Sequence, residues 1–126
     1  MSVQRFLFNI SADDIEQTAG FYQELFGFEI IFRNADWYIQ LAAPGNTAVH
    51  FGIIRSNSSF LPQPLQLPAQ GVIFTIQVDD VDAVYQEVIK RGHPIVQALR
   101  DEEFGQRHFL MTDPNGLIVN VSMPIA

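Results

Sequence analysis

Three histidines are the first candidates for chemistry in this chain: His50, His93 and His108. An imidazole can serve as an acid, a base or a metal ligand near neutral pH. The chain has no cysteine, which excludes disulfides, thiolate metal sites and a cysteine nucleophile. His93 stands between Gly92 and Pro94, in a turn where we expect it to be solvated, so His50 and His108 are the better candidates.

A short acidic run, Asp101-Glu102-Glu103, is a second candidate, because paired carboxylates can perform acid–base work. Its expected place on a loop favours solvated side chains instead. The sequence contains no glycine-rich phosphate loop and no Gly-x-Ser-x-Gly elbow. Ser11 and His50 could form a nucleophile pair, but nothing in their spacing supports one.

The composition is that of a globular domain. Of 126 residues, 48% are hydrophobic and 17% are charged, and the formal net charge is −7. This acidic balance argues against broad nucleic-acid binding, which needs a basic face. The sequence contains no apolar run of the roughly 18 residues that a membrane span needs. Residues 1–5 are not followed by an apolar secretion segment, so a cytoplasmic location is expected.

Two landmarks occur twice along the chain, with spacings of 66 and 70 residues. They are an acidic helix start, Asp13-Asp14-Ile15-Glu16 with Asp79-Asp80-Val81-Asp82, and a turn around proline, Ala43-Pro44-Gly45-Asn46 with Asp113-Pro114-Asn115-Gly116. This repetition predicts one small β-rich unit present in two copies, which can enclose a cavity between them. We expect one domain over residues 1–126, with modules at 5–54 and 71–124 and a proline-containing connection at 55–70.

Each half is expected to run in the order β-α-β-β-β. Apolar alternation predicts strands over residues 5–11, 28–32, 37–41 and 48–54 in the first half, and over 72–78, 95–99, 107–112 and 117–123 in the second. The first helix is expected to begin at Asp13 or Asp14, with Glu16 in a capping box, and to end at Gly27. An apolar stripe over residues 81–89 predicts the second helix, which Gly92 ends.

The order of these elements resembles the vicinal oxygen chelate superfamily, which includes glyoxalase I, the bleomycin-resistance proteins and the extradiol dioxygenases. Four segments carry the resemblance: Phe21-Tyr22-Gln23-Glu24-Leu25-Phe26-Gly27-Phe28-Glu29, Val78-Asp79-Asp80-Val81-Asp82-Ala83, Gly105-Gln106-Arg107-His108-Phe109 and Asp113-Pro114-Asn115-Gly116. The resemblance covers essentially the whole chain. It implies an α+β fold in which two βαβββ modules form a curved mixed sheet around a cleft, usually in a homodimer.

Catalytic members of this superfamily hold a divalent metal at four positions, on the first and fourth strand of each module. The resemblance carries these positions onto Leu7, His50, Ile73 and Asn120. Leucine and isoleucine have no donor atom, and an asparagine amide is a weak ligand. A catalytic zinc site usually needs about three protein ligands. We therefore expect no metal site and no cofactor, which places the chain nearest to the metal-free bleomycin-resistance branch.

Strand alternation and the repeat identify the side chains expected to line the cavity. They mix neutral polar groups with aromatic rings, and Phe104 is either loop packing or an aromatic wall. The candidate ligand-binding residues are Asn9, Tyr38, His50, Thr75, Gln77, Phe104, His108 and Asn120. Such a lining suits an uncharged or weakly charged organic molecule. Asn120 and His108 enter this set through the 70-residue offset from His50 and Tyr38.

Several functions remain open at this stage. The expected one is metal-independent binding or sequestration of a small organic molecule in a dimer cleft, with no nucleic-acid or membrane partner. The acidic charge would draw a cationic ligand. The alternative is a divalent-metal-dependent lyase, isomerase or dioxygenase with an atypical metal site. A third is a partner-binding domain that keeps the fold without a ligand.

Overall fold

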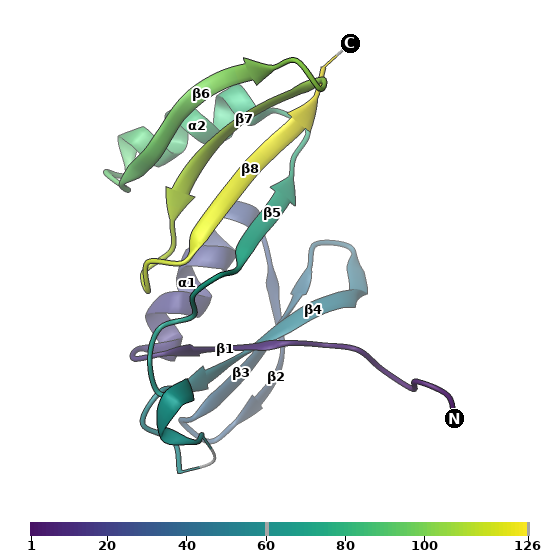
Figure 1. Cartoon of the computed structure of the whole chain (residues 1–126), viewed down its shortest axis with the longest axis vertical. Helices are drawn as coiled ribbons and strands as arrows, with labels where there is room; N and C mark the ends of the chain where they lie inside the picture. Colours follow the sequence, from purple (N-terminus) through teal and green to yellow (C-terminus); the bar gives the residue numbers. More distant parts are fainter. Residues whose placement is uncertain (60, 126) are drawn as a thin grey trace. The chain divides into compact units, whose positions relative to one another are not determined.

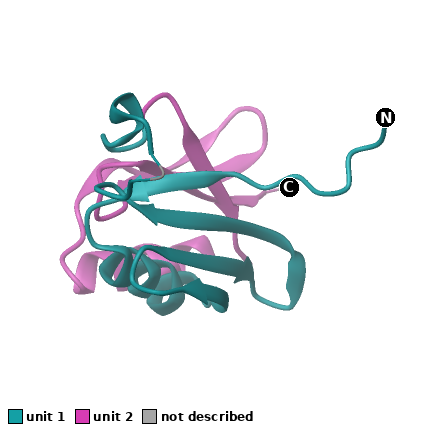
Figure 2. Ribbon diagram, turned by 90° about the horizontal axis from the view of Figure 1, so that it is seen from below, with its two compact units in different colours: residues 1–69 teal, residues 70–126 magenta. Residues whose placement is uncertain are grey.

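The computed structural model describes residues 1–59 and 61–125. It divides the chain into two compact units, Met1–Ala69 and Gln70–Ala126, which repeat the same order of elements (Figure 2). Within the described residues, no helix combines the length and the apolar character that crossing a membrane requires.

The first unit is a four-stranded mixed sheet with one helix on one of its faces (Figure 1). Its elements are β1 (Asn9–Ala12), α1 (Ile15–Phe26), β2 (Glu29–Asn34), β3 (Tyr38–Ala43) and β4 (Asn46–Arg55), followed by the short 3₁₀ helix η1 (Gln63–Leu65). The strand order is β1-β4-β3-β2, with β1 parallel to β4 and the other pairs antiparallel.

The second unit has the same topology. Its elements are β5 (Ile73–Gln77), α2 (Val81–Lys90), β6 (Ile95–Glu102), β7 (Gln106–Thr112) and β8 (Ile118–Pro124). The strand order is β5-β8-β7-β6, with β5 parallel to β8. The predicted α+β fold of two βαβββ modules is confirmed, with one separate sheet in each unit.

Each helix begins at an aspartate that caps it. Asp14 Oδ1 accepts a hydrogen bond from the Gln17 backbone N–H at 2.9 Å, and Asp80 Oδ1 accepts one from the Ala83 N–H at 3.0 Å. These bonds satisfy backbone donors that have no partner in the first turn of a helix. The predicted Asp13–Glu16 capping box is wrong, because Asp13 accepts a hydrogen bond from Ser56 instead. The predicted stop at Gly27 is confirmed by its left-handed φ of 73°.

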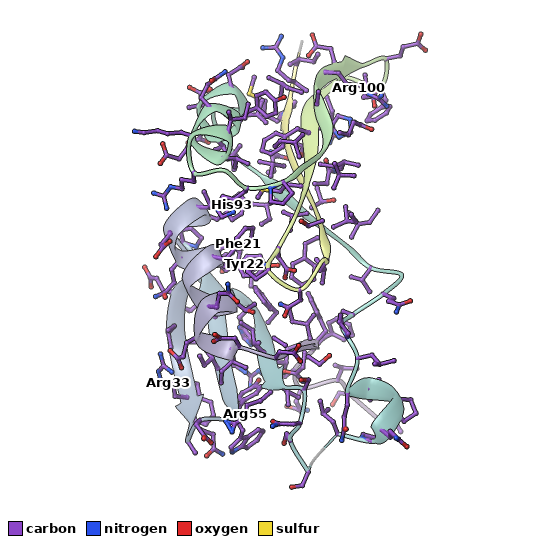
Figure 3. The ribbon with its side chains drawn as sticks, turned by 90° about the vertical axis from the view of Figure 1, so that its left-hand side faces the viewer. Phe21, Tyr22, Arg33, Arg55, His93 and Arg100 are labelled. Atoms are coloured by element: carbon purple, nitrogen blue, oxygen red, sulfur yellow. The ribbon has the colours of Figure 1, made fainter. Side chains whose placement is uncertain are left out.

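The core of each unit lies between its helix and the helix-facing side of its sheet. In the first unit, Ile39, Leu41 and Ile53 are fully buried, and the Tyr22 ring of α1 meets the Phe51 ring edge-on at 5.1 Å. Figure 3 labels Phe21 and Tyr22 on α1. The fully buried apolar side chains of the second sheet are Phe109, Met111, Val119 and Val121.

Most predicted strand boundaries differ from the structure by one or more residues, and three of the differences concern the candidate site. The first strand begins at Asn9 rather than at residue 5, because its neighbour β4 pairs with it only from Gly52 onward. The strand predicted over 95–99 continues to Glu102, which pairs with Gln106 of β7. Arg55 belongs to β4 rather than to the connection. In each case the hydrogen-bonding neighbour sets the strand's length, and single-strand alternation does not report that neighbour.

Candidate functional site

The sheet face of the first unit that points away from α1 carries polar side chains from three strands. The ladder aligns Asn9 of β1 with Gly52 of β4, and Gly52 in turn with Gln40 of β3. Tyr38 and His50 share this face, because side chains two residues apart along a strand lie on the same side. The helix-facing positions between them are apolar and buried. Strand alternation therefore creates a polar face opposite an apolar one.

A continuous set of hydrogen bonds joins these side chains. We call Arg5, Asn9, Tyr38, Gln40 and His50 the first row. Tyr38 Oη donates to Asn9 Oδ1 at 3.0 Å, and Gln40 Nε2 donates to Tyr38 Oη at 3.0 Å. Arg5 Nη2 donates to Gln40 Oε1 at 3.0 Å and lies 2.7 Å from His50 Nε2. The bonds run in one direction, from the guanidinium to Asn9.

Both ring nitrogens of His50 have partners within the first unit. Nδ1 lies 2.9 Å from the Thr47 carbonyl oxygen, which can only accept a hydrogen bond. Nε2 faces the Arg5 guanidinium, which can only donate. A carbonyl at Nδ1 and a guanidinium at Nε2 place the ring N–H at Nδ1 and the acceptor at Nε2. The imidazole is therefore fully engaged by groups of the protein itself.

Gly52 allows the first row to form. A Cβ atom at this position would lie 2.1 Å from Asn9 Oδ1 and 2.3 Å from Tyr38 Oη. Both distances are well below any van der Waals contact. The missing side chain thus lets the Tyr38 hydroxyl and the Asn9 amide meet directly above the β4 backbone.

The second unit has a corresponding row on the sheet face opposite α2. We call Thr75, Arg100, Glu102, His108 and Asn120 the second row. His108 Nδ1 lies 2.8 Å from Asn120 Oδ1, and Asn120 Nδ2 donates to Thr75 Oγ1 at 3.3 Å. Glu102 Oε2 lies 2.9 Å from His108 Nε2 and accepts from Arg100 Nη2 at 3.0 Å. His108 Nε2 also lies 3.5 Å from Gln97 Nε2, so both ring nitrogens are engaged by side chains of the second unit.

Neighbouring side chains favour the ionised form of Asp101 and Glu102, the last two residues of β6. The hydrogen bond from His108, and then the one from Arg100, lower the pKa of Glu102 from its ordinary 4.5. The hydrogen bond from Arg107 lowers the pKa of Asp101 from its ordinary 3.8. Asp101 and then Asp82 raise the pKa of Arg107 in return. The acidic run was expected to be solvated, and Asp101 is indeed exposed although it is paired with Arg107. Glu102 differs, because it is only partly exposed and is paired with His108 and Arg100.

The eight predicted ligand-binding residues fall into two groups, one in each unit. Asn9, Tyr38 and His50 belong to the first row, while Thr75, His108 and Asn120 belong to the second row. The Phe104 ring is 73% exposed and lies 6.5 Å from the His108 ring, centroid to centroid. Gln77 pairs with Ser122 across the ladder on the same face as the second row, but among the described residues it makes no side-chain hydrogen bond to the row.

Four members of the rows are absent from the predicted set: Arg5, Gln40, Glu102 and Arg100, whose guanidinium donates to Glu102. Arg5 precedes the observed strand, yet it shares the parity of Asn9, and this could have indicated its face. Gln40 lies two residues from Tyr38 on the same strand face, and it links Arg5 to Tyr38. Glu102 was assigned to a loop, although β6 extends through it. Its position on a strand end brings its carboxylate onto His108.

Strand pairing also changes the internal correspondence of the two units. Asn9 pairs with Gly52, and the equivalent Thr75 pairs with Asn120. Asn120 therefore corresponds to Gly52 rather than to His50, and the 70-residue offset does not hold along β4. The reason is an irregularity in the β3–β4 ladder between Ala42 and Ala43, which the β7–β8 ladder lacks. Ile118 then corresponds to His50, and the Ile118 side chain has no atom that could bind a metal.

No group of three His, Cys, Asp or Glu side chains within residues 1–59 and 61–125 is arranged to hold a metal ion. The four positions carried over from the superfamily are Leu7, His50, Ile73 and Asn120. Leu7 and Ile73 offer no ligand atom. His50 is engaged at both nitrogens, and Asn120 is bonded to His108 and Thr75.

Comparison with known proteins gives a consistent set of matches. A family model described as Glyoxalase/Bleomycin resistance protein/Dioxygenase superfamily matches residues 5–121. The metallothiol transferase FosB of Lysinibacillus sphaericus is 22% identical over 121 residues, which cover 91% of this chain and 77% of FosB. A bleomycin resistance protein of Klebsiella pneumoniae is 26% identical over 120 residues, covering 90% of this chain and 86% of the relative.

A solved structure agrees with these relatives. The crystal structure of a glyoxalase/bleomycin resistance protein/dioxygenase family enzyme from Burkholderia phytofirmans superposes with a TM-score of 0.79 at 21% identity, covering 94% of this chain and 97% of that one. At this identity the likeness establishes the fold alone.

Proposed function

Because the chain belongs to the Glyoxalase/Bleomycin resistance protein/Dioxygenase superfamily, we propose that it binds a small organic molecule without the help of a metal ion. The bleomycin resistance protein among its relatives supports a binding role by name. Within either unit, the polar row supplies groups that can orient such a molecule, and aromatic rings of the same unit supply apolar contact. The proposal includes a homodimer.

The state of His50 is the observation that carries this proposal. Of the four positions carried over from the superfamily, only His50 has a good ligand for a transition metal. Its Nε2 lone pair is directed at a guanidinium 2.7 Å away, and its Nδ1 is directed at a carbonyl. A divalent cation would have to displace Arg5 and then sit beside its positive charge. Both steps oppose metal binding at this position.

A thermal-shift screen tests the proposal. A ligand that binds only the folded state raises the midpoint of thermal unfolding. The increase grows with the ratio of the ligand concentration to its Kd. We expect aromatic or peptide-like organic compounds to raise the midpoint equally with and without EDTA. Zn²⁺, Ni²⁺, Mn²⁺ and Fe²⁺ alone should leave it unchanged. A midpoint that responds to metals, or to organic compounds only when a metal is present, would overturn the proposal.

A metal-dependent lyase, isomerase, transferase or dioxygenase is the second candidate. The metallothiol transferase FosB among the relatives favours it. The same screen separates the two candidates, since the second requires a metal response that the first excludes. Light scattering on the purified protein tests the homodimer independently of either outcome.

A further inference from the structure

Arg5 differs from the other five arginines in its partners. Each of the others forms a salt bridge with a carboxylate: Arg33 with Glu16, Arg55 with Asp36, Arg91 with Glu87, Arg100 with Glu102, and Arg107 with Asp82 and Asp101. Arg5 instead contacts Gln40 and His50, and no carboxylate among residues 1–59 and 61–125 pairs with it. The chain has 14 acidic residues and only seven basic ones. An arginine without a carboxylate is therefore the exception in this protein.

In the first row, the side-chain hydrogen-bond acceptors already receive bonds from other members of the row, whereas some donors make no bond within it. The Gln40 Oε1, Tyr38 Oη, Asn9 Oδ1 and His50 Nε2 atoms each receive a hydrogen bond from the next member. The Arg5 Nε donates to His50 and its Nη2 donates to Gln40. The two N–H groups of Nη1 therefore remain as donors. Asn9 Nδ2 is likewise a donor without a bond to the row. A ligand group that completes this row must therefore be an acceptor.

Gln40 and His50 hold the Arg5 guanidinium, and neither is a carboxylate that would neutralise its charge. Gln40 is 7% exposed, so its amide is a fixed anchor, whereas Arg5 itself is exposed to solvent. A planar guanidinium held in this way matches the geometry of a carboxylate or a phosphonate. The neighbouring Tyr38 ring lies 5.5 Å from the Trp37 ring and 6.1 Å from the Phe32 ring, centroid to centroid. Tyr38, which is linked to Arg5 through Gln40, thus brings aromatic surface to the same sheet face.

We infer that Arg5, positioned by Gln40 and His50, binds an oxyanion carried by the organic ligand, a carboxylate or a phosphonate attached to an aromatic or apolar body. This inference rests on the proposed function and names its ligand class. It replaces the expectation of an uncharged or cationic ligand at this sheet face. The net charge of −7 does not oppose it strongly, since charges beyond about 8–10 Å are screened at physiological salt.

Titrations with matched small probes test the inference. Benzoate and phenylphosphonate present the oxyanion on an aromatic ring, and benzamide presents the same ring without the charge. We expect both anions to shift NMR signals of the first row and benzamide to bind at least about tenfold more weakly. Arg5→Gln should weaken the two anions by about tenfold and leave benzamide unchanged. Arg5→Lys should restore part of the anion affinity, since it keeps the charge but loses the planar fork.

Arg33→Gln is the matched control. Arg33 lies on β2 of the same unit and is occupied by Glu16 (Figure 3), so its loss should leave benzoate affinity unchanged. Equal binding of benzoate to wild type and Arg5→Gln, equal binding of benzoate and benzamide, or no saturable binding of either anion would each overturn the inference. If organic compounds still stabilise the protein in the EDTA screen, the inference alone has failed. If none does, the proposed function has failed as well.

Discussion

The Nε2 atom of His108 lies 2.9 Å from Oε2 of Glu102, across the turn between β6 and β7. The repeat predicted His108 as a ligand-binding residue, whereas Glu102 was expected to be solvated on a loop. The hydrogen bond favours the ionised carboxylate, and Arg100 favours it further. Glu102 therefore contributes to the stability of the folded state in a way that depends on pH.

Acidification should remove this contribution. The pKa of Glu102 is lower in the folded chain than its ordinary 4.5, so its stabilising effect is present above that value and is lost as the pH falls through the lowered pKa. Thermal midpoints of wild type and Glu102→Gln, measured between neutral pH and about pH 3, should converge in acid. A constant difference between the two proteins at every pH would contradict this expectation.

Replacing His50 with alanine should weaken ligand binding while the chain still folds. The substitution removes the acceptor that holds Arg5, and His50 lies partly exposed rather than in the core. Calorimetric titration of the best ligand from the screen, together with a urea melt, measures both effects. Val49→Ala, one residue away on the opposite face of β4, is the control and should leave affinity unchanged. Loss of the folded state in His50→Ala would make His50 a structural residue.

Gly52→Ala should destabilise the first unit by about 1–3 kcal/mol, because the new methyl group meets Asn9 Oδ1 and Tyr38 Oη at 2.1 and 2.3 Å. Urea unfolding measures the loss. Gly20→Ala serves as a control within α1, where the added methyl group comes no closer than 4.0 Å to Glu24 Oε1. That change should be neutral or stabilising by up to about 1 kcal/mol. Similar losses in both variants would show that the first row does not depend on the missing side chain.

The Asp80 cap of α2 should contribute about 1 kcal/mol to the free energy of unfolding, which is the typical cost of replacing a capping aspartate with alanine. Asp80→Ala removes the acceptor for the Ala83 N–H, whereas Asp79→Ala removes an adjacent exposed carboxylate that does not cap the helix. Only the first substitution should lower the urea midpoint appreciably. An equal decrease for both would mean that charge, rather than capping, sets the effect.

Purified protein should contain much less than one Zn, Ni, Mn or Fe per chain. This follows from the four positions at which the superfamily's metal would bind, where the only strong donor type is the engaged His50. Elemental analysis after gel filtration provides the measurement. One equivalent of any of these metals would contradict the expectation and favour the metal-dependent alternative.

Much of the fold could be predicted because it depends on local pattern. The period-two alternation of β3 buries Ile39 and Leu41 and leaves Tyr38 on the opposite, polar face, where Tyr38 was expected. Gly27 ends α1 in the left-handed conformation, as expected for a glycine at that point. These features follow from the pleat of a strand and from the steric freedom of glycine, and both can be read within a few residues.

The partners within each row could not be predicted in the same way. The sequence alone determined the two βαβββ modules and the face on which Asn9, His50, His108 and Asn120 lie. Only the tertiary structure decided that Arg5 holds His50 and that Glu102 holds His108. It also showed that Asn120 corresponds to Gly52. Strand alternation fixes the side of a sheet, but the lateral alignment of neighbouring strands fixes which side chains meet, and one irregularity in a ladder shifts that alignment.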